Sequence, residues 1–528
     1  MGINTVSDII RVHGVERADH RALVLGDRVV SWGELQSRAG QVANGLAASG
    51  VGNQDRIAFL DKNGIEHFEV FYGASLLNAV CVDVNWRLAA PEVEYIVNDA
   101  EAKVLFVGHE FLPVLDAIAG NLTTVSTIVV IAPAGGEPSS TYRDYESWLA
   151  SFPTTDPGAQ SASDDVAFQL YSSGTTGRPK GVMLTNENFF ALLPVAKEIW
   201  EFSPSTVNLV AMPLFHIGGG GWAVAGQYEG ATSIIVRDLD PTLLVKLIGQ
   251  EQITHAFLVP AVLQFMLMVP GVNDADFSSL QIIVYGASPI SEEVLARSVE
   301  LFGCKFWQAY GLTETTGAVV NLAPRDHDTT GRNRHRLRSC GLPGPGVELR
   351  IVDTDGETDV ATGEVGEIWI RGKQVMKGYW HMPEETERSI TPDGWFKTGD
   401  AGFVDDDGYL YIHDRVKDMI VSGGENVYPA EVENVLMSHP AIADVAVIGV
   451  PHERWGETAK AMVVRKANEA GAALTEQEVI DFARERLAKF KCPTSVDWID
   501  ALPRNPSGKI LKKDLRAPYW EGRERQVN

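Results

Sequence analysis

The amino-acid sequence predicts an α/β protein that ends in a smaller α+β unit. Strands and helices alternate over roughly the first 320 residues, an order typical of largely parallel sheets flanked by helices. From about Gly341 this alternation gives way to short strands separated by glycine turns, which predict a β-rich subdomain. At 528 residues the chain is too long for one ordinary domain, so we expect it to divide into a few units.

Four stretches carry the strand–helix alternation along the chain. Residues 29–51 run from a short strand into an amphipathic helix, with apolar residues three and four positions apart. The same rhythm recurs in residues 56–85, 233–260 and 281–303. Residues 132–163 are rich in Pro, Gly, Ser, Thr and Asp, and they predict a surface connection.

Shorter patterns describe the remaining segments. GVELRIVD (346–353), GEVGEIWIRG (363–372) and GYLYIHD (408–414) are the expected strands of the β-rich subdomain. The longest apolar run, residues 256–272, is interrupted by prolines and falls short of the ~20 residues that span a bilayer. We therefore interpret this run as core and expect no transmembrane segment.

Composition and charge exclude several classes of function. Hydrophobic residues make up 45% of the chain, which suits a globular protein, and the formal net charge of −25 argues against binding of nucleic acid, which needs a basic surface. The four cysteines are far apart and form no CxxC pair, which fits a reducing cytosol. The basic segment GRNRHRLR (331–338) stands out in this acidic chain, and we interpret it as a solvated loop.

The stretch YSSGTTGRPKGV (171–182) has the composition of a phosphate-binding loop. Its glycines let the backbone approach an anion closely, its hydroxyls add hydrogen-bond donors, and Lys180 adds a cation. The spacing does not match the Walker pattern, because Pro179 stands where the second glycine of that pattern belongs. The candidate phosphate-binding residues are Ser172, Ser173, Gly174, Thr175, Thr176, Gly177 and Lys180.

Seven further motifs are spread along nearly the whole chain. They are WGELQ (32–36), MPLFHIGG (212–219), YGAS (285–288), YGLTE (310–314), GWFKTGD (394–400), DRVKDMIVSGGENVYP (414–429) and NPSGKI (505–510). Together with the stretch at 171–182, this set resembles the signature of the adenylate-forming superfamily, which includes acyl-CoA synthetases, luciferases and the adenylation domains of peptide synthetases. The pattern is most similar to that of fatty-acid–CoA ligases.

This resemblance implies a domain organisation and a reaction. A large N-terminal domain (1–413, with the β-rich subdomain at about 341–413) would be joined by a hinge (414–417) to a small mobile C-terminal domain (418–528). A carboxylate would attack the α-phosphorus of ATP, because the resulting adenylate has a better leaving group than oxide. Mg²⁺ would accompany ATP, and CoA would then displace AMP.

By the same resemblance, individual residues take roles in nucleotide binding. Glu314 would hold Mg²⁺, which prefers oxygen ligands, and Thr313 would bond the α-phosphate. Tyr310 would stack on adenine, Asp400 would accept from the ribose hydroxyls, and Arg415 would contact ribose or phosphate. The implied walls of the adenine pocket are Gly286, Ala287, Ser288, Gln308, Ala309 and Gly311.

Two C-terminal motifs complete the implied site. Lys509 would bridge the substrate carboxylate and the α-phosphate, stabilising the charge that develops in the transition state. The glycine turn formed by Ser422, Gly423 and Gly424 would face the active site in the second half-reaction and leave a narrow channel for pantetheine.

The residues around His216 bear on the acid substrate. His216 stands where amino-acid-activating relatives carry Asp, and it opposes binding of a substrate ammonium; in fatty- and aryl-acid relatives this His lies beside the carboxylate. Behind it, residues 218–221 are all glycine and either form a pocket wall that admits a long chain or make a flexible loop. Residues 261–268 either line the pocket or belong to the core. Trp86 departs from the family pattern, because relatives often have Pro there.

The sequence thus predicts a cytoplasmic, ATP-dependent acid–CoA ligase that acts on a medium- or long-chain fatty acid. An aryl (hydroxycinnamate) CoA ligase is the alternative within this class, and a fatty-acyl-AMP ligase or a luciferase-like oxygenase shares the motifs. The intact set Glu314, Asp400, Arg415 and Lys509 speaks against a non-catalytic binding protein. The sequence leaves two points open: whether the protein forms a homo-oligomer, and whether residues 331–338 contact CoA or a membrane surface.

Overall fold

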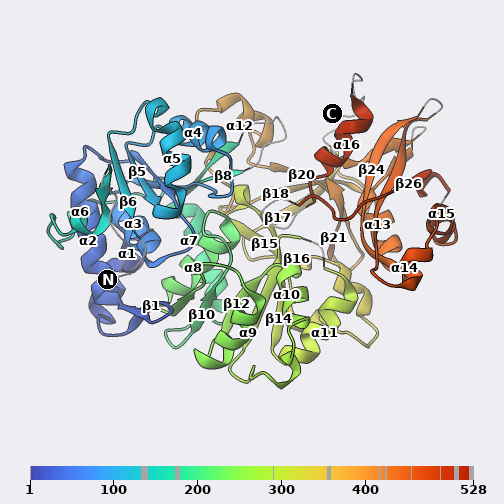
Figure 1. Cartoon of the computed structure of the whole chain (residues 1–528), viewed down its shortest axis with the longest axis horizontal. Coiled ribbons are helices and arrows are strands. Elements are labelled where there is room, and N and C mark those ends of the chain that lie inside the picture. Colours follow the sequence, from blue (N-terminus) through green and yellow to red (C-terminus); the bar gives the residue numbers. More distant parts are fainter. Residues whose placement is uncertain are drawn as a thin grey trace.

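The described part of the chain folds into four β-sheets and the helices that cover them (Figure 1). The computed structural model describes residues 2–521 apart from 133–140, 173–178, 289, 354–357, 416–417, 423–424, 453–454, 488 and 505–509. Two large sheets form the N-terminal body, a four-stranded sheet follows them, and a five-stranded sheet forms the C-terminal unit. This arrangement confirms the predicted α/β class with a large N-terminal part, a β-rich segment and a smaller C-terminal part.

The first large sheet contains nine strands. Their order is β16 (Leu342–Pro343), β15 (Gly317–Leu322), β14 (Lys305–Leu312), β13 (Ile282–Gly286), β12 (His255–Leu258), β10 (Val207–Val210), β11 (Thr232–Ile235), β1 (Arg21–Leu25) and β2 (Arg28–Ser31). The strands from β14 to β1 pair in parallel, and the outer strands pair antiparallel. Helices α9 (Pro241–Gln250) and α11 (Glu292–Phe302) connect parallel strands, as the alternation predicts.

The second large sheet contains eight strands. Their order is β19 (Gly378–Tyr379), β9 (Lys180–Thr185), β8 (Val166–Ser172), β4 (Val80–Asp83), β3 (Arg56–Leu60), β5 (Val104–Gly108), β6 (Thr127–Ile131) and β7 (Arg143–Asp144). From β8 to β7 the pairing is parallel, whereas β9 and β19 pair antiparallel. The hairpin β8–β9, which carries the predicted phosphate loop, therefore lies at one side of this sheet.

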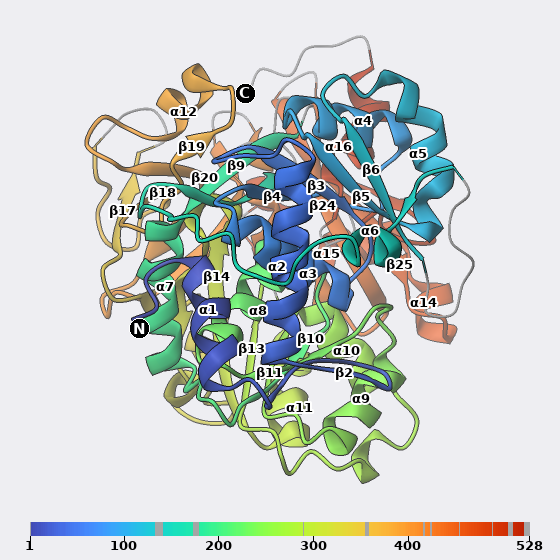
Figure 2. The same cartoon turned by 90° about the vertical axis from the view of Figure 1, so that its left-hand side faces the viewer.

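One hydrophobic core joins the two large sheets. Helices α1 (Val6–Glu16), α2 (Trp32–Ala48) and α3 (Ile65–Leu76) lie side by side there (Figure 2), and Leu35 and Phe68 are buried together with strands of both sheets. Helix α2 starts with a capping box, in which Ser31 accepts from the N–H of Glu34 at 3.2 Å and the Glu34 carboxylate accepts from the N–H of Ser31 at 2.8 Å. A second core lies under α4 (Ala90–Asp99) and α5 (Leu112–Ile118).

The remaining sheets are smaller. The four-stranded sheet is antiparallel, in the order β17 (Glu348–Val352), β18 (Gly366–Arg371), β20 (Phe396–Val404) and β21 (Leu410–Arg415). The C-terminal sheet runs β23 (Glu425–Val427), β22 (Ile420–Ser422), β25 (Gly456–Arg465) and β24 (Ile442–His452), with β26 (Ser495–Trp498) paired to β25. Its core is separate and is packed by α13 (Pro429–Met437) and α15 (Glu476–Arg484). The other C-terminal helices are α14 (Glu469–Ala473) and α16 (Lys512–Trp520).

The end of β21 bears on the predicted hinge. Arg415 is paired with Asp400 across β20 and β21, so the backbone of residues 414–415 belongs to the four-stranded sheet. Residues 416–417 lie outside the described part of the chain. The domain boundary at 413 and the hinge therefore stay predictions.

The connection predicted at 132–163 contains more structure than its composition suggests. Helix α6 (Tyr145–Leu149) lies within it, and Tyr145, Trp148 and Leu149 are buried in the main core. The prediction of a plain surface connection is wrong for this part, because apolar residues three and four positions apart give even this short segment a face to bury. The apolar run at 256–272 is core only in part, since Phe265 and Met268 on or next to α10 (Pro260–Leu267) are 53% and 70% exposed.

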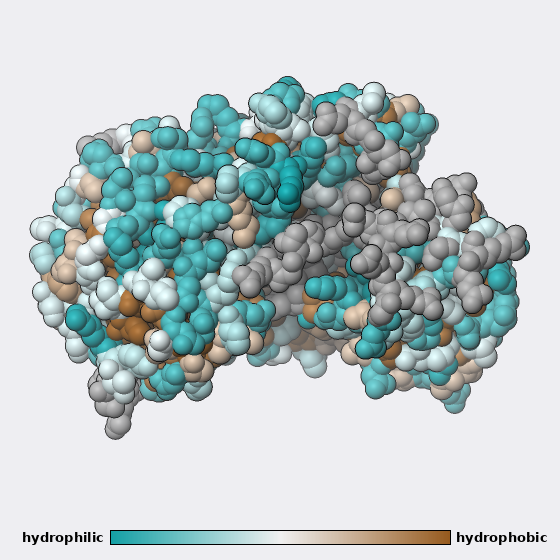
Figure 3. Space-filling view, turned by 90° about the horizontal axis from the view of Figure 1, so that it is seen from above, coloured by the Kyte–Doolittle hydropathy of each residue, from teal (hydrophilic) through white to brown (hydrophobic). Residues whose placement is uncertain are grey.

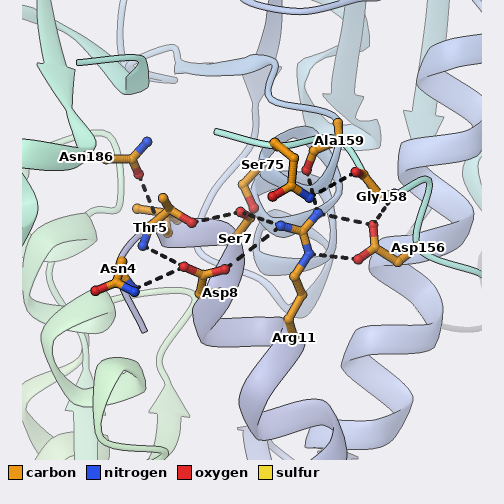
Figure 4. Close-up of polar contacts among 12 residues, drawn as sticks. Asn4, Thr5, Ser7, Asp8, Arg11, Ser75, Asp156, Gly158, Ala159 and Asn186 are labelled. Atoms are coloured by element: carbon orange, nitrogen blue, oxygen red, sulfur yellow. Dashed lines mark hydrogen bonds and ion pairs between the residues drawn. The ribbon is translucent and has the colours of Figure 1, made fainter. Parts of the chain in front are cut away.

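The rest of this connection is tied to α1. Arg11 donates from Nε to Asp156 at 2.7 Å and from Nη2 to the carbonyl of Ala159 at 2.8 Å (Figure 4). The N–H of Val6 donates to Asn186 Oδ1 at 3.0 Å, and Asn186 begins α7 (Asn186–Ile199) directly after β9. Because the segment at 156–159 leads into β8, α1 holds the chain on both sides of the β8–β9 hairpin.

The basic segment 331–338 is also more ordered than predicted. Its residues Arg334–Arg338 form a 3₁₀ helix. The side chain of Arg336 is 18% exposed and pairs with Asp326 at 3.0 Å and with Asp407 at 2.9 Å, so the interpretation as a solvated loop is wrong for this residue. Among the residues that Figure 3 colours by hydropathy, hydrophilic ones predominate on the face seen from above. None of the described helices is long and apolar enough to cross a membrane.

Candidate active site

The hairpin of β8 and β9 frames the predicted phosphate loop. Ser172 ends β8, Lys180 begins β9, and the two are direct partners across the hairpin. The loop is therefore closed at its base by a strand pair, which fixes the positions at which the chain leaves and re-enters the sheet. The remaining candidates, Ser173, Gly174, Thr175, Thr176 and Gly177, lie outside the described residues, and their phosphate contacts stay predictions.

Glu314 lies next to the base of this loop. It belongs to a single 3₁₀ turn, η4 (Thr313–Thr315), which follows β14 directly, and it is buried. Its Oε1 accepts from the hydroxyl of Ser172 at 3.0 Å and from the hydroxyl of Tyr379 at 3.2 Å. The structure thus joins the predicted phosphate loop to the predicted Mg²⁺ ligand, and it adds Tyr379 to the site.

The turn that presents Glu314 is conformationally unusual. Thr316 has a φ of +55°, in the left-handed region that a β-branched residue rarely adopts and that costs about 1–3 kcal/mol. Its hydroxyl donates to the carbonyl of Gln374 at 2.7 Å, and the N–H of Leu312 donates to Thr315 Oγ1 at 2.8 Å. These side-chain bonds hold the turn in place, so that the direction of the Glu314 carboxylate is fixed by its neighbours on both sides.

The predicted adenine wall lies where β13 and β14 end. A Cβ at Gly286 would lie 2.1 Å from the carbonyl oxygen of Ala309, so only glycine fits between these strands. Ala287, the next residue, is exposed and has a φ of +65°. Strained backbone at an exposed strand end is typical of functional sites. Residues 308–311 lie in the second half of β14, beside the end of β13, and Ser288 follows Ala287.

Tyr310 and Asp400 are joined directly. The hydroxyl of Tyr310 donates to Asp400 Oδ2 at 2.8 Å, and both side chains are buried. Burial, and then the charge of Asp400, raises the pKa of Tyr310 well above its usual value, so the hydroxyl stays protonated and remains a donor. Asp400 is also the strand partner of Arg415. Three residues that the sequence assigned to one nucleotide are therefore neighbours, although none of their contacts with a nucleotide is tested.

Lys180 makes a different contact from the one predicted. Its ammonium pairs with Glu385 of α12 (Pro383–Ser389) and lies 4.9 Å from the ring centroid of Tyr379. The side chain is 8% exposed. In this structure a carboxylate of the same chain neutralises the ammonium of Lys180. The expected contact of Lys180 with phosphate therefore stays a prediction.

His216 lies at the start of α8 (Ile217–Tyr228), among aromatic rings. Its ring centroid is 4.5 Å from that of Phe215, and Trp86 meets Phe215 edge-on at 6.4 Å. The guanidinium of Arg87 lies over Trp86 at 4.1 Å. Trp86, which departs from the family pattern, therefore places an aromatic ring beside the His216 motif, and Arg87 adds a cation next to that ring.

The start of α8 adjoins the turn that holds Glu314. A Cβ built on Gly317 would lie 3.6 Å from Cγ1 of Ile217. The histidine and the carboxylate thus come from neighbouring segments of the site.

The glycines after His216 do not form a bare pocket wall. A Cβ at Gly219 would lie 2.1 Å from the carbonyl oxygen of Pro213, and one at Gly220 would lie 2.8 Å from that of Leu214. One at Gly218 would lie 2.9 Å from the ring of Phe257. The prediction of a pocket wall is wrong for these three residues. Gly219 and Gly220 let α8 pack directly against the chain that leads into it, and Gly218 packs against Phe257 of β12.

Two predicted parts of the site are described only in part or not at all. Ser422 is buried at the end of β22 in the C-terminal sheet, while Gly423, Gly424 and Lys509 lie outside the described residues. Within the described part of the chain, no group of three or more His, Cys, Asp or Glu residues could hold a metal ion. Mg²⁺ bound together with phosphates commonly uses only one or two carboxylates, so a single Glu314 fits that ion.

Comparison with known proteins decides the family. Residues 11–380 match the AMP-binding enzyme family, and residues 431–509 match the AMP-binding enzyme C-terminal domain. The chain belongs to the AMP-binding enzyme family. It is an adenylate-forming enzyme, as the motifs predict.

Relatives and solved structures agree over almost the whole chain. The fatty acid–[acyl-carrier-protein] ligase ScoC of Streptomyces coeruleorubidus is 38% identical over 100% of this chain and 98% of its own. The long-chain-fatty-acid–CoA ligase FadD13 of Mycobacterium tuberculosis is 37% identical, covering 93% of each chain, and the feruloyl-CoA synthase of an Amycolatopsis species is 37% identical, covering 94% and 95%. ATP-bound MatB from Rhodopseudomonas palustris superposes with a TM-score of 0.87 at 29% identity, over 98% of this chain and 99% of its own.

Some residues of this AMP-binding enzyme could not be found from its motifs. Tyr379 and Glu385 lie in GYWHMPEET (378–386), a stretch for which the sequence suggested no role, and Arg87 follows the unusual Trp86. The one available signal was the run of aromatic and acidic residues between two recognised motifs. It gave no indication that Tyr379 would reach Glu314.

Proposed function

We propose that the protein is an ATP-dependent acid–CoA ligase that acts on a medium- or long-chain fatty acid. The carboxylate attacks the α-phosphorus of ATP to give acyl-AMP and pyrophosphate, and the thiol of CoA then displaces AMP to give the thioester. Membership of the AMP-binding enzyme family supports the adenylate. The choice of acid and of acceptor thiol is the further step that this proposal makes.

One arrangement carries the proposal for the first half-reaction. Ser172, at the base of the phosphate-loop hairpin, bonds to Glu314, and Tyr310, four residues earlier on the same segment, bonds to Asp400. A nucleotide whose ribose lies at Asp400 would therefore direct its phosphates along β14 towards Glu314. Glu314 would hold Mg²⁺ and Thr313 would bond the α-phosphate; bound Mg²⁺ would neutralise charge on the transferring phosphates.

The C-terminal unit would supply the remaining groups. Lys509 would stabilise the charge shared by carboxylate and α-phosphate, and Arg415 would contact the nucleotide. In the second half-reaction the turn at 422–424 would face the site and admit pantetheine. The residues predicted as hinge, 414–417, would let the C-terminal domain adopt the two orientations that the two steps need.

The surroundings of His216 support a carboxylic acid without an ammonium group. Phe215 lies against His216, Trp86 meets Phe215 edge-on, and the guanidinium of Arg87 lies over Trp86, so an aromatic cluster with a cation adjoins this end of α8. Aromatic walls favour an apolar acid, and a nearby guanidinium disfavours a second positive charge. The similarity to FadD13, whose name specifies long-chain fatty acids, supports a fatty acid.

An aryl acid is the second candidate substrate. The feruloyl-CoA synthase of Amycolatopsis matches this chain with the same identity as FadD13, and aromatic rings beside His216 suit a phenyl ring as well as an alkyl chain.

A panel of acids tests both candidates. AMP release is measured with ATP, Mg²⁺ and CoA for acids from acetate to oleate, together with cinnamate, ferulate and a sterol side-chain acid. We expect the highest kcat/KM between octanoate and oleate, at least about tenfold above acetate, because each buried CH₂ contributes ~0.8 kcal/mol. A preference for ferulate contradicts the fatty-acid proposal. A parallel reaction with holo acyl carrier protein in place of CoA identifies the acceptor, because ScoC is named for that protein.

A further inference from the structure

We infer that Tyr379 is a positioning residue for Glu314, and that it fixes one carboxylate oxygen so that the other can face Mg²⁺. This inference rests on the proposed function, which gives Glu314 the metal. Tyr379 lies outside every motif that identified the site, in the two-residue strand β19. Its hydroxyl nevertheless reaches Glu314 Oε1 at 3.2 Å.

The two hydrogen bonds to Glu314 end on the same oxygen. Ser172 and Tyr379 both donate to Oε1, from opposite strands of the edge formed by β8, β9 and β19. Among the described residues, none donates a hydrogen bond to Oε2. A carboxylate held through one oxygen presents the other in a fixed direction, which is how outer-shell hydrogen bonds orient metal ligands.

The hydroxyl of Tyr379 is the donor in this hydrogen bond. Its side chain is buried, and its O–H reaches Glu314 Oε1, because a carboxylate oxygen accepts.

The ring of Tyr379 is fixed independently of this hydroxyl. The ammonium of Lys180 lies 4.9 Å from the ring centroid and is paired with Glu385. The backbone N–H of Tyr379 donates to Thr386 Oγ1 at 2.9 Å, and Gly378 and Tyr379 pair with Met183 and Val182 of β9. Removing the hydroxyl alone should therefore leave the ring in place.

These contacts make the base of the phosphate loop and the Glu314 turn one unit. Ser172 and Lys180 are strand partners, and Ser172 bonds to Glu314 directly. Lys180 contacts the ring of Tyr379, whose hydroxyl bonds to the same carboxylate. A metal at Glu314 and phosphates at the loop would thus be held at a constant separation. This places Lys180 as a support of the site, with its charge matched by Glu385.

The test is the variant Tyr379→Phe, which removes one oxygen and keeps the ring. The stabilisation of the protein by ATP is followed by thermal shift at fixed ATP and increasing Mg²⁺, and pyrophosphate release is measured over the same series. We expect the Mg²⁺ concentration at half-effect to rise about tenfold in both measurements, as for loss of an outer-shell partner. The melting temperature without ligand should change little, and excess Mg²⁺ should restore most of the rate.

Tyr142→Phe is the matched control. The hydroxyl of Tyr142 also donates to a carboxylate, Asp116, at 3.0 Å, but at an exposed position remote from the site. An Mg²⁺ dependence of Tyr379→Phe equal to that of this control overturns the inference, and so does a loss of rate that is the same at every Mg²⁺ concentration. If the unaltered protein releases no pyrophosphate and ATP with Mg²⁺ does not stabilise it, the proposed function fails, and this inference fails with it.

Discussion

At the scale of single residues, hydroxyl groups hold the carboxylates of the site. Glu314 is held through Oε1 by Ser172 and Tyr379, and Asp400 is held through Oδ2 by Tyr310. A carboxylate offers about four lone-pair positions, so each of these groups can still accept from a ligand or coordinate a cation. Hydroxyl donors add no positive charge to the site, and they fix the direction of each carboxylate. A site for phosphates and ribose requires both.

Glu314→Gln tests the charge of this residue while keeping its shape. The amide oxygen can still accept from Ser172 and Tyr379, but the side chain loses the negative charge that a hard cation such as Mg²⁺ prefers. We expect pyrophosphate release to fall by about tenfold or more at low Mg²⁺ and to recover in part as Mg²⁺ rises. Steady-state rates across an Mg²⁺ series give this result directly.

The control for this prediction is Glu300→Gln, at an exposed position on α11. A Glu314→Gln enzyme with the kinetics of this control would remove Glu314 from the metal site.

The same residues show how far the sequence could lead. Glu314 and Asp400 were named from their motifs, because each motif is a local pattern. Tyr379 and Glu385 were not, because their contacts join residues 65 and 205 positions apart in the chain. Contacts of that kind depend on strand pairing, and the pairing of β19 with β9 follows from no local pattern of two residues.

At the scale of elements, helix α8 packs unusually closely against the backbone that precedes it. Its first turns pass directly over residues 212–214, and the glycines at 219 and 220 leave room for that backbone. From the sequence the same glycines suggested a pocket wall, because an absent side chain is equally compatible with a cavity and with close contact. Only the position of the neighbouring backbone distinguishes the two.

Gly219→Ala should therefore destabilise the protein. Its Cβ would lie 2.1 Å from the carbonyl oxygen of Pro213 and 2.6 Å from that of Met212, and backbone atoms cannot move away as a flexible side chain can. We expect a loss of about 1–3 kcal/mol or more in the free energy of unfolding, the range for overpacked cores. Denaturant unfolding followed by tryptophan fluorescence measures it. Gly120→Ala is the control, because a Cβ there meets nothing within 4 Å; equal stability of the two variants would contradict the packing argument.

The regular elements were the most predictable part of the fold. The strand–helix alternation at 29–51, 56–85, 233–260 and 281–303 corresponds to real strands and helices, because each has a clear apolar period over several turns. Helix α6 was missed because five residues are too few for a period to emerge among the polar residues around it. The η4 turn was missed because Thr316 adopts a backbone conformation that its side chain disfavours, which is possible only where tertiary bonds enforce it.

At the scale of the whole molecule, the candidate site lies where three sheets meet. Ser172 comes from the eight-stranded sheet, Tyr310 from the nine-stranded sheet and Asp400 from the four-stranded sheet. The hydrogen bonds Ser172–Glu314 and Tyr310–Asp400 cross these boundaries, so the residues that would bind one nucleotide also hold the sheets together. Binding of ATP should therefore stabilise the N-terminal part as a whole.

The basic segment 331–338 belongs to the same scale, because its arginines link separate parts of the chain. Arg336 joins Asp326, which follows β15, to Asp407 in the turn between β20 and β21, and it lies 4.3 Å from the ring centroid of Tyr409. Arg334 and Arg338 both pair with Glu292 at the start of α11 and are 57% and 72% exposed. One arginine is thus part of the packing between the nine-stranded and four-stranded sheets, and two are surface groups.

Arg336→Ser and Arg334→Ser should accordingly differ. Loss of Arg336 leaves Asp326, whose side chain is 5% exposed, with the hydroxyl of Tyr409 at 3.0 Å and the exposed Arg325 at 3.6 Å. The carboxylate loses its nearer and less exposed cation, which costs on the order of 2 kcal/mol, between the values for a buried and an exposed pair. Loss of Arg334 removes an exposed pair worth about 0–1 kcal/mol. The melting temperature should therefore fall clearly in Arg336→Ser alone, while KM for CoA stays unchanged in Arg334→Ser.

Equal melting temperatures of the two variants would contradict the structural role of Arg336. A rise in KM for CoA in Arg334→Ser, with KM for ATP constant, would instead assign the exposed arginines to CoA, and loss of binding to anionic liposomes would assign them to a membrane surface.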